Sequence, residues 1–185
     1  KILDIPEHIE QFPIGTYTVV ETVAAGGMGV IYRAKSQSGE MHALKALMNI
    51  EKATEKQLKR FTEEGRLMNR LDHPNIVKVY EMNVYKSVPY FTMDFLVGQD
   101  LHAILRARSQ TIRKNVTMLS KVCGAVGHAH SKGVIHRDMK PSNIFIRSDG
   151  EPILTDFGLA KNLDSEFKLT AEGAMVGTPL YLSPE

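Results

Sequence analysis

The chain has 185 residues, of which 43% are hydrophobic and 24% are charged, and its formal net charge is +2. These values are typical of a globular protein, and the lack of a basic run argues against nucleic-acid partners. Cys123 is the single cysteine, which excludes an intrachain disulfide. No stretch approaches the ~18 apolar residues of a transmembrane helix. We therefore expect a cytoplasmic protein whose membrane anchor, if it has one, lies outside this chain.

The first half of the chain has the pattern of a sheet with one helix. Residues 1–12 mix charged side chains with Pro6 and form an expected leader. A helix is predicted over 53–71, because the proline of His73-Pro74 disfavours its continuation. Runs rich in β-branched and apolar residues predict strands at 17–23, 30–34, 41–48, 76–80 and 89–95, with a glycine turn between the first two.

After residue 101 the apolar residues recur at intervals of three and four. This spacing predicts an amphipathic helix over 110–131, whose apolar stripe consists of Val116, Leu119, Val122, Val126 and Ala129. Residues 156–185 show no clear period. Strands followed by helices predict an α+β fold in two segregated parts.

A glycine-rich segment, Ala-Ala-Gly-Gly-Met-Gly, occupies residues 24–29 between two predicted strands. This position argues against a dinucleotide-binding fold, and no Gly-Lys-Ser/Thr follows, which argues against a P-loop. Glycines let backbone N–H groups approach a phosphate closely. Taken alone, the segment also fits a plain hairpin turn.

Lys45 and Glu64 are two charged residues in apolar surroundings. Lys45 shares a predicted strand face with Ala43, because side chains alternate along a strand. Glu64 interrupts an apolar helical stripe, where an unpaired carboxylate is costly; the stripe consists of Phe61, Met68 and Leu71. Their spacing fits two hypotheses equally well: an ion pair between Lys45 and Glu64, or a Glu64 side chain that reaches solvent.

The segment 136–143 has the sequence His-Arg-Asp-Met-Lys-Pro-Ser-Asn, and Asp-Phe-Gly follows at 156–158. Either motif alone is common by chance. Their joint occurrence, with a lysine and an asparagine at set offsets, argues against coincidence. Together with Lys45 and the glycine-rich segment, they resemble the serine/threonine protein kinases, including those of bacteria.

The resemblance implies a two-lobed fold and a reaction. An N-lobe over 13–95 would hold an antiparallel sheet and one long helix, and 96–185 would form part of a helical C-lobe. The implied cofactors are ATP and Mg²⁺, and the γ-phosphoryl group would pass to Ser/Thr hydroxyls of protein substrates. The family pattern continues beyond residue 185, so we expect this fragment to expose an apolar face below the helix 110–131 and to have little peptide-kinase activity.

The resemblance also implies roles for the residues of the 136–158 segment. Asp138 would accept the proton of the substrate hydroxyl, and Lys140 would neutralise charge on the transferring phosphoryl group. Asn143 and Asp156 would hold Mg²⁺, which prefers oxygen ligands. A buried column is expected from His136, Phe157, Met68 and Val79.

The nucleotide pocket follows from the same resemblance. The ion pair of Lys45 with Glu64 would aim the lysine at the α- and β-phosphates. Ala24 replaces the first glycine of the family pattern, which is expected to reduce the freedom of the loop. The remaining pocket residues would be Val23, Ala24, Ala25, Gly26, Gly27, Met28, Gly29, Val30, Ile31, Ala43, Met93, Asp94, Leu96 and Phe145.

The segment 177–185 resembles the end of a kinase activation segment. Arg137 is the kind of residue that receives a phosphate and orders such a loop, so Thr170 is the expected autophosphorylation site. A second kinase copy is an implied partner for trans-autophosphorylation. Two other hypotheses stay open: a non-catalytic pseudokinase or docking module, and a small-molecule phosphotransferase of related fold.

Overall fold

The computed structural model describes residues 11–26, 29–47, 51, 53–107, 112–157, 161–162 and 179–181. The chain divides into two compact units, one formed by residues 1–61 and 79–95 and the other by 62–78 and 96–185. The division falls inside α1 (Glu55–Met68), between Phe61 and Thr62. Each unit contains its own sheet and its own buried side chains.

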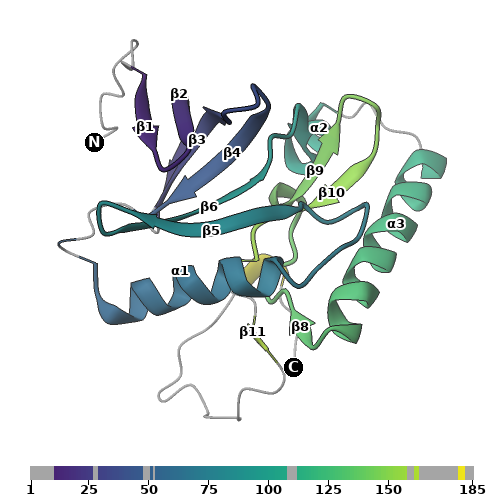
Figure 1. Cartoon of the computed structure of the whole chain (residues 1–185). Coiled ribbons are helices and arrows are strands. Elements are labelled where there is room, and N and C mark those ends of the chain that lie inside the picture. Colours follow the sequence, from purple (N-terminus) through teal and green to yellow (C-terminus); the bar gives the residue numbers. More distant parts are fainter. Residues whose placement is uncertain are drawn as a thin grey trace. The chain divides into compact units, whose positions relative to one another are not determined.

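The first unit is built on a six-stranded antiparallel sheet with the order β1-β2-β3-β4-β6-β5, which twists strongly between its two edges (Figure 1). Its strands are β1 (Phe12–Ile14), β2 (Tyr17–Gly26), β3 (Gly29–Lys35), β4 (Met41–Ala46), β5 (Val79–Tyr85) and β6 (Val88–Asp94). Shifts of register in β2 between Val19 and Glu21 and between Thr22 and Ala24 are β-bulges or irregularities, which increase the local twist.

Aromatic rings fill the core of this unit. Tyr17 and Tyr90 are buried with ring centroids 6.5 Å apart, together with Val19, Ala34 and Leu44. Burial and a hydrogen bond to Glu81 raise the pKa of Tyr90 to about 12. The first half of α1 packs on β6, because the Phe61 and Phe91 ring centroids lie 5.2 Å apart and both side chains are fully buried.

Two expectations about the first half of the chain were wrong in their boundaries. The glycine turn is shorter than predicted, since β2 runs to Gly26 and β3 begins at Gly29, leaving only residues 27–28 between them. The strand expected at 76–80 begins at Val79 and runs to Tyr85. Ile76 instead makes an isolated bridge with Leu154, so its apolar side chain belongs to the second unit.

Helix α1 begins at a capping box that sequence analysis did not use. Gln57 N donates to Thr54 Oγ1 at 3.2 Å, and Thr54 N donates back to Gln57 Oε1 at 2.8 Å. These reciprocal bonds satisfy backbone donors that a helix leaves unpaired at its start. The helix predicted over 53–71 is therefore confirmed with narrower bounds, Glu55–Met68.

The second unit carries a three-stranded antiparallel sheet with the order β10-β9-β7 and a two-stranded ladder of β8 with β11 (Figure 1). The strands are β7 (Gly98–Asp100), β8 (Val134–Ile135), β9 (Ile144–Arg147), β10 (Pro152–Leu154) and β11 (Lys161–Asn162). Its helices are α2 (Leu101–Arg106), which Asp100 caps, and α3 (Ile112–Ser131).

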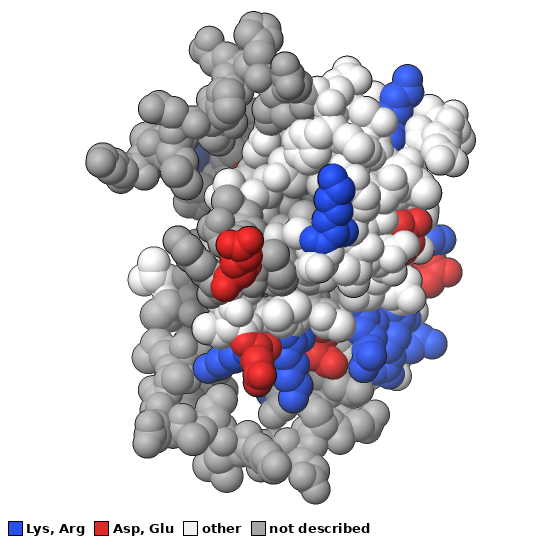
Figure 2. Space-filling view, turned by 60° about the vertical axis from the view of Figure 1, so that its left-hand side comes forward, with Lys and Arg blue, Asp and Glu red and all other residues white. Residues whose placement is uncertain are grey.

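Helix α3 confirms the helix predicted over 110–131, but it buries only part of the predicted stripe. Val122 and Ala129 are buried, whereas Val116 is 61% exposed and Leu119 is 49% exposed. No helix in the described part of the chain is long and apolar enough to cross a membrane. On the face shown in Figure 2, Lys and Arg side chains lie beside Asp and Glu side chains, so its charge is mixed.

We predict that Gly124→Ala raises the free energy of unfolding by about 0.5–1 kcal/mol, because alanine has the higher helix propensity and a Cβ at Gly124 would meet nothing within 4 Å. Urea denaturation measures this. As a contrast, Gly98→Ala should destabilise, since its Cβ would lie 2.0 Å from Ile146 O and φ is +154°. Unchanged or lower stability in Gly124→Ala would contradict the packing described for α3.

Candidate active site

Three polar residues meet in the segment that follows β8. Lys140 Nζ donates to Asp138 Oδ2 at 2.7 Å, and Asn143 Nδ2 donates to the same oxygen at 3.2 Å. The Asp138 side chain is 11% exposed and Asn143 is 4% exposed. The structure therefore brings the two predicted catalytic residues and one predicted metal ligand into a single hydrogen-bonded cluster.

The orientation of Asn143 is set from both sides. Asn143 Nδ2 also donates to the backbone oxygen of Asp138 at 2.8 Å, so the Oδ1 atom of the same amide group points away from that oxygen. Its backbone oxygen accepts from Thr155 N at 2.9 Å and from Thr155 Oγ1 at 3.2 Å. Since Thr155 precedes Asp156, these bonds hold the two predicted metal ligands on neighbouring, connected segments.

The donor set of Asn143 and Asp156 fits Mg²⁺. One amide oxygen and one carboxylate are the hard ligands this ion takes, with phosphate oxygens and waters completing its shell. Asp156 is exposed and therefore accessible to a ligand. Among the described residues no group of three or more His, Cys, Asp and Glu side chains could hold a metal.

The backbone of this segment is held in an uncommon conformation at two positions. Arg137 has φ +65° and Asp156 has φ +58°, both in the left-handed region that non-glycine residues rarely adopt. Each such residue costs roughly 1–3 kcal/mol and persists only where its surroundings hold it. The hydrogen bonds around Asn143 and Thr155 provide that restraint.

His136 has a structural role in the cluster. Its Nε2 lies 2.9 Å from Thr155 O, and its Nδ1 accepts from Asp138 N at 3.3 Å. Only the neutral imidazole with its proton on Nε2 satisfies both contacts. Burial lowers the pKa of His136, which favours this neutral form.

Part of the predicted buried column is present in the second unit. The rings of His136 and Phe157 have centroids 4.5 Å apart, and Phe157 is fully buried. Met68 is also buried in this unit, and Val79 is buried in the first unit. The stacking of Val79 onto the other three stays a prediction.

In the first unit, strand register places several predicted pocket residues on one face of the sheet. Lys45 on β4 pairs with Ile31 and Phe91, and its Nζ lies 5.7 Å from the Phe91 ring centroid. Directly opposed residues share a face, as do residues two apart along a strand. The same face therefore carries Ala24, Ile31, Ala43, Lys45 and Met93.

Other predicted residues of this segment point elsewhere. Val30 pairs with Ala25 and Ala46 on the opposite face of the sheet, where it lines a cavity together with Ile14. Any contact of Ala25 or Val30 with a nucleotide would thus involve the backbone. Val23 is 52% exposed near the second irregularity of β2.

The glycine-rich segment is constrained by close backbone approach. A Cβ at Gly29 would lie 2.5 Å from Ala46 O, so only glycine fits beside β4 there. Ala24 lies inside β2, paired with Ile31, and is not among the described non-glycine residues with positive φ. The expected loss of loop freedom at Ala24 stays a prediction. Gly26 pairs with Gly29, and the predicted residues Gly27 and Met28 lie outside the described residues.

Glu64 is only 3% exposed, which rules out the hypothesis that its side chain reaches solvent. A buried carboxylate requires compensation by charge or hydrogen bonds. Lys45 belongs to the first unit and Glu64 to the second, and their ion pair stays a prediction.

The residues predicted to hold the adenine base belong to both units. Asp94 ends β6 and accepts a hydrogen bond from the Tyr80 hydroxyl at 2.6 Å, which raises the pKa of Tyr80 to about 12. Leu96 begins the second segment of the second unit, and Phe145 lies on β9 opposite Ile153. The predicted phosphorylation site Thr170 and most of 177–185 lie outside the described residues.

Comparison with known families supplies the decisive observation. The family model "Protein kinase domain" matches residues 17–185. The chain belongs to the protein kinase family. The predicted α+β kinase fold is confirmed, since the crystal structure of the Mycobacterium tuberculosis PknI kinase domain superposes with a TM-score of 0.70 and 28% identity, covering 83% of this chain and 64% of that one.

Curated relatives of this kinase chain are bacterial serine/threonine-protein kinases. It is 36% identical over 176 residues to Pkn1 of Myxococcus xanthus, covering 92% of this chain and 25% of Pkn1. It is 34% identical over 190 residues to PkaA of Streptomyces coelicolor, covering 94% of this chain and 35% of PkaA. The kinase chain thus spans only a minor part of the length of these relatives.

We predict that acidification destabilises the fold through His136. The pKa of His136 is lowered in the folded state, so just below pH ~6.5 the unfolded chain binds more protons than the folded chain. The stability that is present above this pH is therefore lost as the pH falls toward the pKa of His136 in the folded state. Urea unfolding of wild type and His136→Gln across this range measures the effect.

The difference in stability between wild type and His136→Gln should shrink on acidification. The exposed His130 supplies the control, since His130→Gln should leave the wild-type pH profile in place. A His136→Gln protein with the same pH profile as wild type would contradict the assignment of a neutral buried imidazole.

Proposed function

We propose that this chain carries the nucleotide-binding and catalytic residues of a serine/threonine protein kinase, which transfers the γ-phosphoryl group of ATP to Ser/Thr hydroxyls of protein substrates. The observation that carries the proposal is the hydrogen-bonded cluster of Asp138, Lys140 and Asn143. Membership of the protein kinase family and the names of the bacterial relatives support it.

Asp138 is the residue that acts on the acceptor. Its carboxylate accepts from Lys140 and Asn143 through Oδ2, which fixes the orientation of the group. It would accept the hydroxyl proton and orient the hydroxyl oxygen in line with the phosphoryl group. Lys140, held beside it, would neutralise charge that spreads over the phosphoryl oxygens in the transition state.

Asn143 and Asp156 are the proposed metal ligands, through Asn143 Oδ1 and the Asp156 carboxylate. Mg²⁺ held by these two side chains would supply charge neutralisation for the phosphate groups. The bonds from Thr155 to the backbone oxygen of Asn143, and those from the Asn143 side chain to Asp138, hold Asn143 in place before any ligand binds. Such prior orientation lowers the reorganisation needed at the moment of reaction.

The nucleotide would lie against the sheet face that carries Ile31, Ala43, Lys45 and Met93. Apolar side chains on this face suit an adenine ring, and backbone groups of 94–96 would bond its edge. Lys45, aimed by Glu64, would contact the α- and β-phosphates, and the backbone of 24–29 would approach them. We also propose that residues 13–95 form the N-lobe of the kinase domain and that residues 96–185 form part of its C-lobe.

Regulation by phosphorylation forms the last part of the proposal. Arg137 is exposed and immediately precedes the catalytic carboxylate in sequence. A phosphate on Thr170, added by a second kinase copy, would pair with this guanidinium and order the segment around it. The pseudokinase hypothesis is not favoured by any observation, since Lys45, Glu64, Asp138, Asn143 and Asp156 are all present.

We predict that Asp138→Asn lowers phosphoryl transfer by about 100-fold or more. Asparagine keeps the shape of the aspartate side chain, but its amide cannot accept the hydroxyl proton. The assay uses radiolabelled ATP, a generic protein substrate and the full-length protein. The matched control is Asp72→Asn, at an exposed carboxylate with no place in the proposed site.

The outcome separates the hypotheses. Transfer that survives in Asp138→Asn would contradict the proposal, and labelling of a small metabolite alone would favour the small-molecule phosphotransferase. Mass spectrometry of the same wild-type samples locates the phosphate on the kinase itself. Labelling of Ser165 with Thr170 unmodified would contradict the proposed regulatory site.

A further inference from the structure

The last two residues of the first unit, Asp94 and Phe95, are each held by a side chain from another strand. The Tyr80 hydroxyl on β5 donates to Asp94 Oδ1 at 2.6 Å. The Arg33 guanidinium on β3 lies 5.2 Å from the centroid of the Phe95 ring. Both contacts act on residues 94–96, the segment whose backbone is proposed to bond the adenine base.

Tyr80 reaches Asp94 from an irregularity in strand β5. The register of β5 on β6 shifts between Val79 and Glu81, so Tyr80 is an extra residue in the ladder. Extra residues of this kind bend a strand and re-aim a side chain. Tyr80 bonds the Asp94 side chain, and the next residue, Glu81, accepts from the Tyr90 hydroxyl at 3.0 Å. Two consecutive residues of β5 thus both bond side chains of β6.

The Tyr80 side chain is 48% exposed, yet a series of aromatic contacts that begins in the core fixes its ring. The ring packs edge-on against His42, with centroids 5.1 Å apart. His42 in turn packs edge-on against the buried Tyr17, with centroids 5.5 Å apart. Edge-to-face contacts are a favoured arrangement of aromatic pairs. The core of the first unit is therefore linked through two rings to the carboxylate of Asp94.

The bond from Tyr80 to Asp94 has the geometry of a strong hydrogen bond. Its length of 2.6 Å is typical of a hydroxyl that donates to an ionised carboxylate. The same carboxylate, together with burial, raises the pKa of Tyr80 to about 12. The phenol therefore keeps its proton at neutral pH and remains the donor.

Tyr80 acts from the face of the sheet that lies away from the proposed nucleotide. Met93 pairs with Ala43, and their side chains lie on the face that also carries Lys45. Side chains alternate along a strand, so the Asp94 side chain lies on the other face. Tyr80 would therefore act through the backbone of Asp94 and not by contact with the nucleotide.

We propose that Tyr80 is a positioning residue for the base of the nucleotide: it fixes the Asp94 carboxylate and thereby orients the backbone of residues 94–95 for hydrogen bonds to adenine. The inference rests on the proposed kinase function, because it assigns a role within the proposed base site. Arg33 holds the next residue, Phe95, so loss of the Tyr80 hydroxyl should loosen this segment without releasing it.

Calorimetric titration of adenosine into the full-length protein tests this role, because adenosine carries no phosphate and needs no Mg²⁺. Tyr80→Phe keeps the ring that packs on His42 but removes the donor. It should weaken adenosine binding by about fivefold, as expected for the loss of one orienting hydrogen bond. In an assay of phosphoryl transfer to a protein substrate, the same variant should raise KM for ATP by a similar factor and leave kcat unchanged.

Tyr90→Phe is the matched control for a merely structural effect. The Tyr90 hydroxyl also bonds a carboxylate, that of Glu81, between the same two strands, and the pKa of Tyr90 is likewise raised to about 12. Both variants lose a tyrosine–carboxylate hydrogen bond, so urea denaturation should show lower stability in both. Only Tyr80→Phe should weaken adenosine binding, because Glu81 lies outside the base-binding segment.

The outcomes separate the positioning role from the kinase function. If Tyr80→Phe binds adenosine as tightly as wild type, the positioning role fails, while phosphoryl transfer by wild type leaves the kinase function standing. Equal weakening in Tyr80→Phe and Tyr90→Phe would show a general effect of lost stability and would also overturn the role. Wild-type protein that binds no adenosine and transfers no phosphoryl group would contradict the kinase function, and the positioning role with it.

Discussion

The double attachment of Asn143 is the interaction on which the candidate site depends. Its side-chain nitrogen holds the backbone and carboxylate of Asp138, and its backbone oxygen holds Thr155. One buried residue thus joins the segment that would act on the acceptor to the segment that would bind metal. A buried amide whose hydrogen bonds are made is rigid, and breaking one partner leaves a costly unpaired group.

Thr155 gives this connection a second link. Its backbone oxygen faces His136 Nε2, while its N–H and hydroxyl bond Asn143. The left-handed backbone at Arg137 and Asp156 lies next to these anchored residues, so the strain is held where a ligand would arrive. A neutral His136 is part of the same restraint, because a proton on Nδ1 would face the N–H of Asp138.

Short-range patterns predicted the parts of the site that are close in sequence. Asp138, Lys140 and Asn143 lie close together in the sequence, so the contacts among them form within one short segment of the chain. Non-local pairing was harder to predict: Ile76 looked like part of a strand with Val79, but its partner Leu154 is far along the chain. The face on which Val30 lies follows from strand register, which a glycine-rich sequence specifies weakly.

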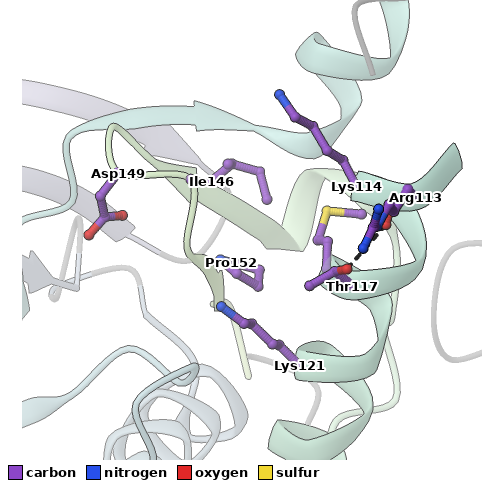
Figure 3. A pocket seen from close by; sticks show the side chains of 9 residues that line it. Arg113, Lys114, Thr117, Lys121, Ile146, Asp149 and Pro152 are labelled. Atoms are coloured by element: carbon purple, nitrogen blue, oxygen red, sulfur yellow. Dashed lines mark hydrogen bonds between the residues drawn. The ribbon is translucent and has the colours of Figure 1, made fainter. Parts of the chain in front are cut away.

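Some signals were present in the sequence but unused. Thr54 and Gln57 have the spacing of a capping box, and Thr155 directly precedes the predicted metal ligand. The packing of α3 on the β9–β10 hairpin (Figure 3) could not be predicted from sequence, because the two strands of this hairpin were not recognised. Val116 and Leu119 fit the helical stripe, yet spacing alone does not tell which turns of a helix are covered.

The most direct test of the account is calorimetric titration of ATP into the full-length protein with and without Mg²⁺, comparing wild type with Asn143→Ala. If Asn143 links the catalytic carboxylate to the metal, the variant should lose the Mg²⁺-dependent gain in affinity by at least about tenfold, with metal-free binding unchanged. An unaltered Mg²⁺ dependence in Asn143→Ala would contradict the central role given to this residue.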